Sequence, residues 1–238
     1  MRIDIITIFP HIFDSYFCES IIKRAQAKKL LDIRVHNLRD FTHDKHHKVH
    51  DSPYGGGAGM VLKAEPIIRA VDAIRKRAKG KPKVVVFSAK GEQYTQQMAV
   101  EWVKKYRRIV CISGRYEGMD ERVMKALGAE EISIGPYVLT DGDAAAMVMV
   151  SSLVRLIPGA IKFESLQEES HWSALLKKKK GSGKTPARTH RFGTGGLEYP
   201  HYTRPEVFAY REKKYAVPRV LLGGNHKKID EWRKKHQK

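Results

Sequence analysis

Two glycines enclose an arginine, a tyrosine and a glutamate in the segment Gly114-Arg-Tyr-Glu-Gly118, which directly follows a run of apolar residues. Glycines of this kind let the backbone of a strand-to-helix corner approach a compact ligand closely. Two further corners, over residues 88–91 (SAKG) and 134–142, each follow a predicted strand. In an open parallel sheet, ligands bind at the edge where such loops diverge. We therefore expect a small-molecule pocket there, in which Glu117 and Asp141 balance a positive charge or accept hydrogen bonds from hydroxyl groups.

A second glycine-rich stretch, Tyr54-Gly-Gly-Gly-Ala-Gly-Met60, lies in a long polar loop predicted for residues 39–60. Backbone with so little side-chain bulk lets a planar or phosphorylated ligand reach main-chain N–H groups. A plain linker is the alternative interpretation. The same loop holds four histidines, at positions 43, 46, 47 and 50. Their spacing would suit a metal only on a helix, which the nearby Pro53 opposes, so polar contacts with an anionic partner are favoured over metal binding.

The elements that must position these corners alternate between strand and helix. Strands are predicted over residues 2–9, 31–38, 83–88, 108–113 and 130–134, and helices over residues 11–28, 64–79, 93–105, 120–127 and 143–156. Val-rich runs such as KVVVFS are typical of strands that are buried on both faces. The pattern therefore predicts an α/β protein with a mainly parallel sheet.

The chain is strongly basic. Its 238 residues include 45 Lys and Arg against 26 Asp and Glu, which gives a formal net charge of +19. Since each phosphate that a protein neutralises releases counterions, this excess favours a polyanionic partner, and nucleic acid is the natural candidate. A basic surface that merely confers solubility is the alternative.

The opening residues and the cysteines indicate a cytoplasmic protein without a membrane partner. The start MRIDIITIFPHIF lacks the apolar run of a signal peptide, and no window approaches eighteen consecutive apolar residues. Cys18 and Cys111 lie far apart without metal-type spacing. We expect two buried free thiols.

The composition changes after Pro158. Residues 164–170 (ESLQEES) are acidic and polar, and residues 177–191 (KKKKGSGKTPARTHR) hold seven Lys and Arg and no acid. The GSGKT run lacks the first glycine and the preceding strand of a nucleotide-binding P-loop. A basic arm that contacts phosphates is favoured. The remaining tail, residues 197–238, ends in a predicted basic helix over residues 227–238.

Ten separate motifs in the chain resemble those of the bacterial tRNA (guanine-N1)-methyltransferase TrmD family, which is of the SPOUT class. They run in family order over nearly the whole chain. The matching stretches are RDFTHD (39–44), PYGGG (53–57), GM (59–60), GRYEG (114–118), DERV (120–123), SIG (133–135), YVL (137–139), RLIPG (155–159), PHYTRPEV (200–207) and GNH (224–226).

The resemblance implies a SPOUT-type α/β fold, with a parallel sheet, a deep trefoil knot and a short helical C-terminal appendage. Residues 1–163 would form the catalytic domain that binds S-adenosylmethionine. Residues 164–196 would be a linker with a basic insertion, and residues 197–238 a shortened helical domain that binds tRNA. A homodimer with its active sites at the subunit interface is implied as well.

Carried over position by position, the resemblance also implies two sets of contact residues. Those expected at the cofactor are Phe87, Ser88, Gly114, Tyr116, Glu117, Gly118, Ile134, Gly135, Tyr137, Leu139 and Gly142, mostly through backbone groups, with Glu117 at the methionine end. Those expected at the tRNA are Tyr54, Gly55, Gly56, Gly57, Lys177, Lys178, Lys179, Lys180, His201 and Arg204.

The implied reaction transfers a methyl group from S-adenosylmethionine to N1 of the guanine immediately 3′ of the anticodon, position 37 of tRNA. Guanine N1 carries a proton at neutral pH, so methylation needs a base to remove that proton and a cation to hold the charge that develops on O6. The family's aspartate base falls on Glu169, with Glu168 as the alternative register, and its arginine falls on Arg155. No metal ligands are assigned, although magnesium stimulates the family.

Three departures from the family pattern accompany the resemblance. Glutamate replaces the aspartate, which moves the carboxylate one methylene further out. A basic stretch of residues near 177–196 intervenes where the family has a short linker, and the family's C-terminal domain extends beyond the position of Lys238. The basic insertion is expected to compensate through phosphate contacts. The alternatives are a SPOUT methyltransferase that modifies a ribose 2′-hydroxyl, and an RNA-binding protein of the same fold without chemistry.

Overall fold

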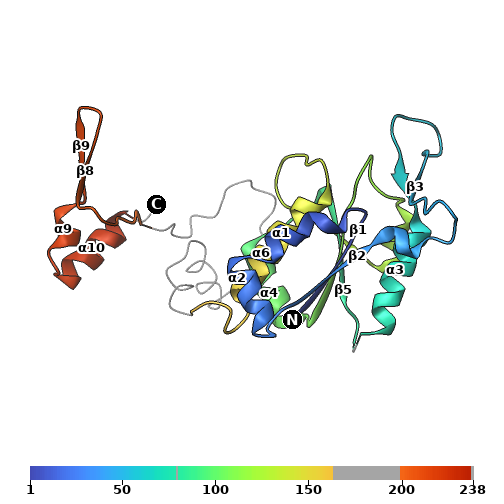
Figure 1. The fold of residues 1–238 in the computed structure, drawn as a ribbon, viewed down its shortest axis with the longest axis horizontal. Helices are drawn as coiled ribbons and strands as arrows, with labels where there is room; N and C mark the ends of the chain where they lie inside the picture. The colour runs from blue at the N-terminus through green and yellow to red at the C-terminus, as the bar shows by residue number, and fades with distance from the viewer. Residues whose placement is uncertain (79, 163–198, 237–238) are drawn as a thin grey trace, which may run out of the picture. The chain divides into compact units, whose positions relative to one another are not determined.

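A five-stranded parallel sheet organises the first part of the chain. The computed structural model describes residues 1–78, 80–162 and 199–236, and the chain divides into two compact units, Met1–Lys162 and Phe163–Lys238. The sheet of the first unit has the strand order β2-β1-β6-β5-β7, and Figure 1 labels its strands β1, β2 and β5. Every pair of neighbouring strands in it is parallel, as predicted. The strands are β1 (Arg2–Thr7), β2 (Asp32–Asn37), β5 (Lys83–Gln93), β6 (Arg108–Ile112) and β7 (Glu130–Ser133).

Helices cover both faces of this sheet because its central strands β1, β5 and β6 carry consecutive apolar residues that are buried on both sides. On one face lie the 3-10 turn η1 (Pro10–Phe13), α1 (Asp14–Phe17), α2 (Ser20–Ala27), α4 (Gln96–Lys105) and α6 (Gly142–Leu156). On the other face lie the 3-10 turn η2 (Leu38–Phe41), α3 (Ala64–Lys76) and α5 (Arg122–Leu127).

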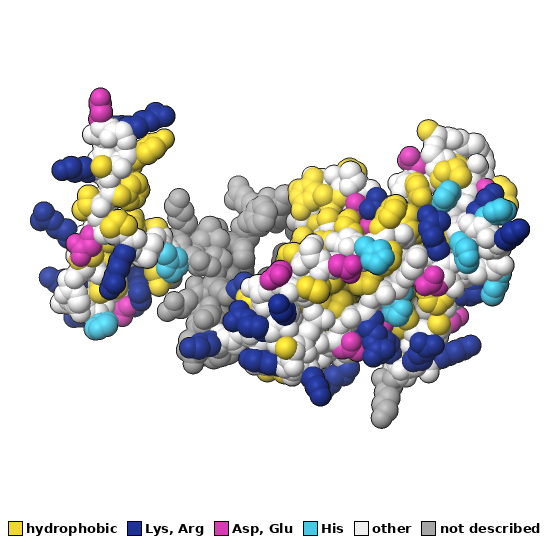
Figure 2. Space-filling model, viewed as in Figure 1, with side chains coloured by type: hydrophobic (Ala, Val, Ile, Leu, Met, Phe, Trp, Pro, Cys, Tyr) yellow, Lys and Arg dark blue, Asp and Glu magenta, His cyan; other side chains and the backbone are white. Residues whose placement is uncertain are grey.

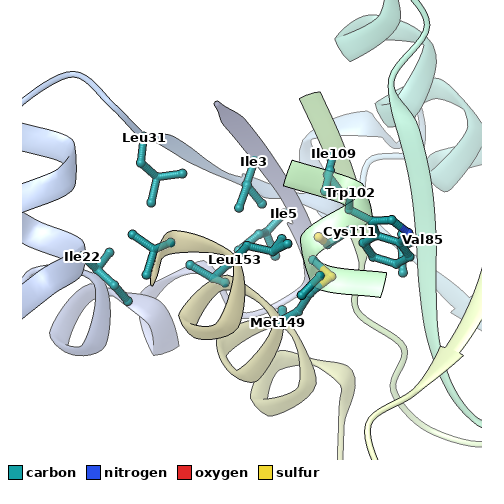
Figure 3. Close-up of a cluster of buried hydrophobic side chains, with 14 of the residues drawn as sticks. Ile3, Ile5, Ile22, Leu31, Val85, Trp102, Ile109, Cys111, Met149 and Leu153 are labelled. Carbon is teal, nitrogen blue, oxygen red and sulfur yellow. The ribbon is translucent and has the colours of Figure 1, made fainter. Parts of the chain in front are cut away.

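Alternate residues of one strand enter different cores. Ile3 and Ile5 of β1 pack with Met149 and Leu153 of α6 (Figure 3), whereas Ile6 joins the cluster under α3 and α5. All five side chains are buried. Successive side chains of a strand point to opposite faces, so the two helical layers are fixed to one sheet.

Strand β5 extends further than the predicted residues 83–88. Its pairing with β7 shifts register between Phe87 and Glu92, so that the predicted corner at residues 88–91 is an irregular part of the strand. Gly91 makes this possible, because a Cβ there would stand 2.6 Å from the carbonyl carbon of Glu131. The sequence pattern does not reveal a bulge of this kind, since the apolar run ends at Phe87.

Three further predictions differ from the structure. The helix expected over residues 11–28 is broken into η1, α1 and α2, with Ser20 at a φ of 50°. The loop over residues 39–60 ends in a small antiparallel sheet of β3 (His50–Asp51) and β4 (Val61–Leu62). Cys111 is buried as expected, but Cys18 is exposed, because it lies at the break between α1 and α2.

The second unit combines a hairpin with two helices. Its described elements are β8 (Val207–Tyr210), β9 (Lys213–Ala216), α9 (Arg219–Leu222) and α10 (His226–His236). The hairpin was not predicted; the C-terminal basic helix was. Nowhere in the described ranges is a helix both long and apolar enough to cross a bilayer.

Candidate functional site

A cavity of about 600 Å³ opens at the carboxyl ends of β5, β6 and β7. This is the sheet edge at which the sequence predicts a pocket, and the volume is within the range of small-molecule sites. Ten of the eleven predicted cofactor residues line it, namely Phe87, Ser88, Gly114, Tyr116, Glu117, Gly118, Ile134, Tyr137, Leu139 and Gly142.

Gly135 is the eleventh and does not line the cavity. Its N–H donates to Ser133 Oγ over 3.3 Å, and its carbonyl accepts from the same hydroxyl over 2.8 Å. The ring of Tyr137 lies against its α-carbon and leaves no room for a Cβ. Gly135 therefore shapes the loop that holds Tyr137, while Tyr137 itself faces the cavity.

Two segments of the chain meet closely at the cavity, and Gly142 allows their approach. The N–H of Gly142, at the start of α6, donates to the carbonyl of Gly114 over 2.9 Å. A Cβ on Gly142 would stand 2.8 Å from the Gly114 nitrogen. The crossing therefore excludes any side chain at position 142 and leaves backbone groups at the cavity wall.

Arg115 ties the two sides of this crossing together. Its Nη2 lies 3.2 Å from Asp141 Oδ2 and 3.1 Å from Asp143 Oδ2, and its guanidinium lies 4.4 Å from the ring centroid of Phe9. Asp141 also caps α6, because its Oδ1 accepts from the N–H groups of Asp143 and Ala144. Burial raises the pKa of Asp141, but the hydrogen bonds from Ala144 and Thr140 and the charge of Arg115 outweigh it and lower that pKa. Asp141 is thus held as an anion at the cavity.

The corner at Tyr116 and Glu117 joins the cavity to the glycine-rich loop. The Glu117 N–H donates to the Met60 carbonyl over 3.1 Å, and the Glu117 side chain packs so closely on Gly59 that a Cβ there would stand 2.6 Å from its Oε1. Tyr116 adopts a φ of 60°, and its ring centroid lies 4.8 Å from that of His50. Backbone strain at a pocket corner is typical of ligand sites.

The glycine-rich loop itself is open. The Tyr54 side chain is completely exposed, and Gly55, Gly56 and Gly57 are exposed with positive φ angles. The loop that carries these predicted tRNA contacts adjoins the predicted cofactor corner through Gly59 and Met60. Loops presented in this way suit a ligand that is bound through backbone groups.

One ion-paired group at the cavity was missed by sequence reasoning. Lys90 Nζ lies 3.0 Å from Glu121 Oε2 and 3.5 Å from Glu131 Oε1. The hydrogen bond that Lys90 donates to Glu121, together with the charge of Glu131, raises the pKa of Lys90. All three residues line the cavity. The pairing depends on the bulge in β5, for which the sequence carries no clear signal.

Among the charged side chains that line the cavity, acids outnumber bases. Four carboxylates line it, those of Glu117, Glu121, Glu131 and Asp141, against two cations, Lys90 and Arg115. This distribution favours a ligand that carries positive charge.

Three of the remaining predicted residues are described by the structure, and none of the three lines this cavity. Arg155 is in the last turn of α6, thirteen residues after Gly142 and thus about 20 Å along the helix axis from the crossing. His201 and Arg204 are exposed residues of the second unit. The other predicted residues, Glu169 and its alternative Glu168, and Lys177, Lys178, Lys179 and Lys180, lie outside the described residues.

The histidines of the polar loop take part in local contacts. His47 Nδ1 lies 3.0 Å from Thr42 Oγ1 and 3.1 Å from the Arg39 carbonyl, while His50 packs on Tyr116. Over the described ranges, no group of three or more His, Cys, Asp and Glu side chains could hold a metal ion.

Comparison with known proteins gives one consistent result. The chain matches the family described as tRNA (Guanine-1)-methyltransferase TrmD over residues 1–238. It is 44% identical over 236 residues to a tRNA (guanine-N(1)-)-methyltransferase of Dehalococcoides mccartyi (strain ATCC BAA-2266 / KCTC 15142 / 195), covering 99% of this chain and 85% of the relative. It is 45% identical over 234 residues to the protein of that name from Thermomicrobium roseum, covering 98% of this chain and 78% of the relative. It is 45% identical over 235 residues to the tRNA (guanine-N(1)-)-methyltransferase of Bacillus cereus (strain AH820), covering 99% of this chain and 86% of the relative. The chain that forms this cavity therefore belongs to the TrmD family of tRNA (guanine-1)-methyltransferases.

Proposed function

We propose that the protein transfers a methyl group from S-adenosylmethionine to N1 of the guanine immediately 3′ of the anticodon, position 37 of tRNA. The observation that carries the proposal is the acid-lined cavity at the Gly114 and Gly142 crossing. It combines the corners at which the chain resembles its family with a surface that favours a cationic ligand. Membership of the family supports the reaction type.

The cavity residues fit S-adenosylmethionine, whose sulfonium and ammonium groups are cationic. Gly142 leaves its backbone bare at the crossing, and Ser113 Oγ beside it is buried without a partner among the described residues. Backbone groups from the loops at Phe87, Ile134 and Leu139 would hold the cofactor, with Glu117 near its charged end. When bound, the cofactor supplies an electrophilic methyl group.

The remaining chemistry would fall to residues of the chain that act on the guanine. Glu169 would remove the N1 proton, and Arg155 would hold the negative charge that develops on O6. Replacing Glu169 by Gln keeps the size of the side chain and removes the base. We expect turnover to fall about a hundredfold or more, while binding of S-adenosylmethionine is retained. An unchanged rate would remove Glu169 from this role.

We also propose that the site is completed by a second copy of the chain. Because Arg155 lies about 20 Å along α6 from the crossing, it reaches a reaction centre more readily if that centre belongs to a partner subunit. Apolar side chains at η1, α1 and α6 are exposed, with Ile12 at 42%, Tyr16 at 43% and Val148 at 49%. Figure 2 shows hydrophobic side chains gathered over this part of the first unit. A homodimer would bury them.

The fold is proposed to be the SPOUT fold with a trefoil knot. The chain leaves α5 on one face of the sheet, forms β7, and crosses Gly114 before it enters α6 on the other face. A close backbone crossing of this kind is expected where one segment threads past another.

Contacts with the tRNA are proposed at the open loop of Tyr54, Gly55, Gly56 and Gly57, at His201 and Arg204, and at Lys177, Lys178, Lys179 and Lys180. Residues 1–163 would act as the catalytic domain, 164–196 as a linker and 197–238 as a tRNA-binding domain. Stimulation by magnesium is proposed from the family resemblance alone, and a cytoplasmic location from that resemblance together with the two free cysteines.

Transfer of labelled methyl from S-adenosylmethionine to two tRNA transcripts tests the function. The transcripts differ only in carrying guanine or adenine at position 37. We expect label on the guanine form alone, at N1 after nucleoside digestion. Label on both forms, or on a ribose hydroxyl, would contradict the proposed target. Binding of S-adenosylmethionine without any transfer would favour an RNA-binding protein that lacks the chemistry.

A further inference from the structure

The amino edge of the parallel sheet, opposite the cavity, carries a band of exposed cations. Each crossover helix returns the chain to that edge, so the ends of α2, α3 and α4 gather there. Figure 2 shows Lys and Arg side chains along the border of the first unit where Figure 1 places the N-terminus. Two exposed basic residues stand at or just beyond the end of each of these helices: Lys28 and Lys29, Lys76 and Arg77, and Lys104 and Lys105.

Two further cations at this edge do not belong to helices. Exposed Lys81 precedes β5, and exposed Arg107 precedes β6. Arg107 lies beside the start of β1, because its carbonyl accepts from the Arg2 N–H over 2.9 Å. Cations at helix carboxyl ends compensate the helix dipole, which would explain the three helical pairs. That explanation does not extend to Lys81 and Arg107, which lie on loops.

Three carboxylates at this edge are paired with other cations. Asp4 is bound by Arg108 at 2.7 Å, Asp32 by Arg34 at 3.2 Å, and Glu130 by Lys83. In the ranges that the structure describes, none of the eight exposed cations of the band has a carboxylate within ion-pairing distance. The edge therefore presents uncompensated positive charge, whereas at the cavity, at the other end of the strands, carboxylates outnumber cations.

We propose that this amino-edge band binds backbone phosphates of the same tRNA, outside its anticodon arm. The inference rests on the proposed function, which places the anticodon loop at the cavity. Strand β1 has six residues and so separates the two edges by about 20 Å. Phosphates that reach the band therefore belong to a part of the tRNA at a distance from the target base. Contacts of this kind position an RNA without reading its sequence.

A triple variant on the α4 side of the band tests the proposal. Lys104→Gln, Lys105→Gln and Arg107→Gln together remove three positive charges and no residue of the cavity. Binding of labelled full-length tRNA and of its isolated anticodon stem-loop is measured over a series of KCl concentrations. For full-length tRNA we expect the slope of log affinity against log salt to become shallower by about 2 to 3, with an affinity at low salt at least about tenfold weaker. Binding of the stem-loop should stay as in the wild type.

The matched control keeps the charges and changes the side chains. Lys104→Arg, Lys105→Arg and Arg107→Lys should bind full-length tRNA with the wild-type slope. If both triple variants lose affinity alike, packing at the end of α4 and not charge is responsible, and the proposal fails. It also fails if the Gln variant binds full-length tRNA with the wild-type salt slope. The same holds if its affinity for the stem-loop falls as much as its affinity for full-length tRNA. Failure of the proposed function would appear separately, as absence of methyl transfer by the wild-type protein.

Discussion

At the scale of single residues, the glycine crossing is the most demanding feature of the site. A Cβ on Gly142 would stand 2.8 Å from the Gly114 nitrogen and 3.0 Å from the Ser113 α-carbon, and backbone atoms cannot rotate out of the way. We predict that Gly142→Ala weakens binding of S-adenosylmethionine about tenfold or more, because overpacking typically costs about 1–3 kcal/mol and each 1.4 kcal/mol is about tenfold in affinity. Isothermal titration calorimetry measures the change.

Gly223 provides a control for the same substitution. It has a negative φ, and a Cβ there would meet no atom closer than 3.8 Å. Gly223→Ala should therefore leave the affinity for S-adenosylmethionine unchanged. Equal affinities for the Gly142 variant and the wild type would show that the crossing does not form the cofactor wall.

At the scale of elements, three strands of the sheet are joined by one buried carboxylate. Asp4 of β1 is fully buried and binds Arg108 of β6 at 2.7 Å, His36 of β2 at 2.8 Å and Arg2 at 2.9 Å. Burial raises the pKa of Asp4, but the hydrogen bonds from His36, Arg108 and Arg2 outweigh it and hold that pKa well below its usual range. A lowered folded-state pKa stabilises the fold above the unfolded pKa, about 4 for Asp, and this stability is lost as the pH falls further.

We predict that Asp4→Asn lowers the free energy of opening of β1 and β6 by about 3–5 kcal/mol at pH 7, because it leaves buried cations without their anion. The difference from the wild type should shrink below about pH 4 as the native carboxylate approaches its own protonation. Amide hydrogen exchange in these strands measures both quantities. Asp32→Asn is the control, because Asp32 is 49% exposed and its surface pairs should contribute less than about 1 kcal/mol. Similar decreases in the free energy of opening for the two variants would contradict the role assigned to the buried network.

At the scale of the whole molecule, the position of Arg155 predicts that two chains share each reaction centre. Arg155→Ala removes the arginine but leaves the cavity intact, whereas Gly142→Val blocks the cavity but leaves the arginine. Each variant alone should be nearly inactive. After the two are unfolded together and refolded, mixed dimers should recover a clear fraction of wild-type methyl transfer, since one of their two centres has an intact cavity and an intact partner arginine. Activity no greater than the sum of the separate variants would contradict a shared centre.

Much of the fold and of the site could be predicted from the sequence. The strands β1 and β6 follow from runs of buried apolar residues, and the less buried strands β2 and β7 were predicted as well. Ten of the eleven expected cofactor positions line one cavity. Local patterns suffice for the corners, because each is set by its own glycines and by the strand before it, whereas the eleven positions themselves follow from the family resemblance. The extension of β5 was not predictable, since it depends on the approach of Gly91 to the backbone of β7.

The sequence by itself determined the family, the alternation of strands and helices, and which corners face one edge, because periodicity and short motifs encode these features locally. Only the tertiary structure decided that Arg115 joins Asp141 and Asp143, that Lys90 bridges Glu121 and Glu131, and that Arg155 lies far along α6 from the crossing. It alone also shows that uncompensated cations gather at the amino edge. These features depend on strand order, register and helix direction, which bring together residues that are distant in the chain.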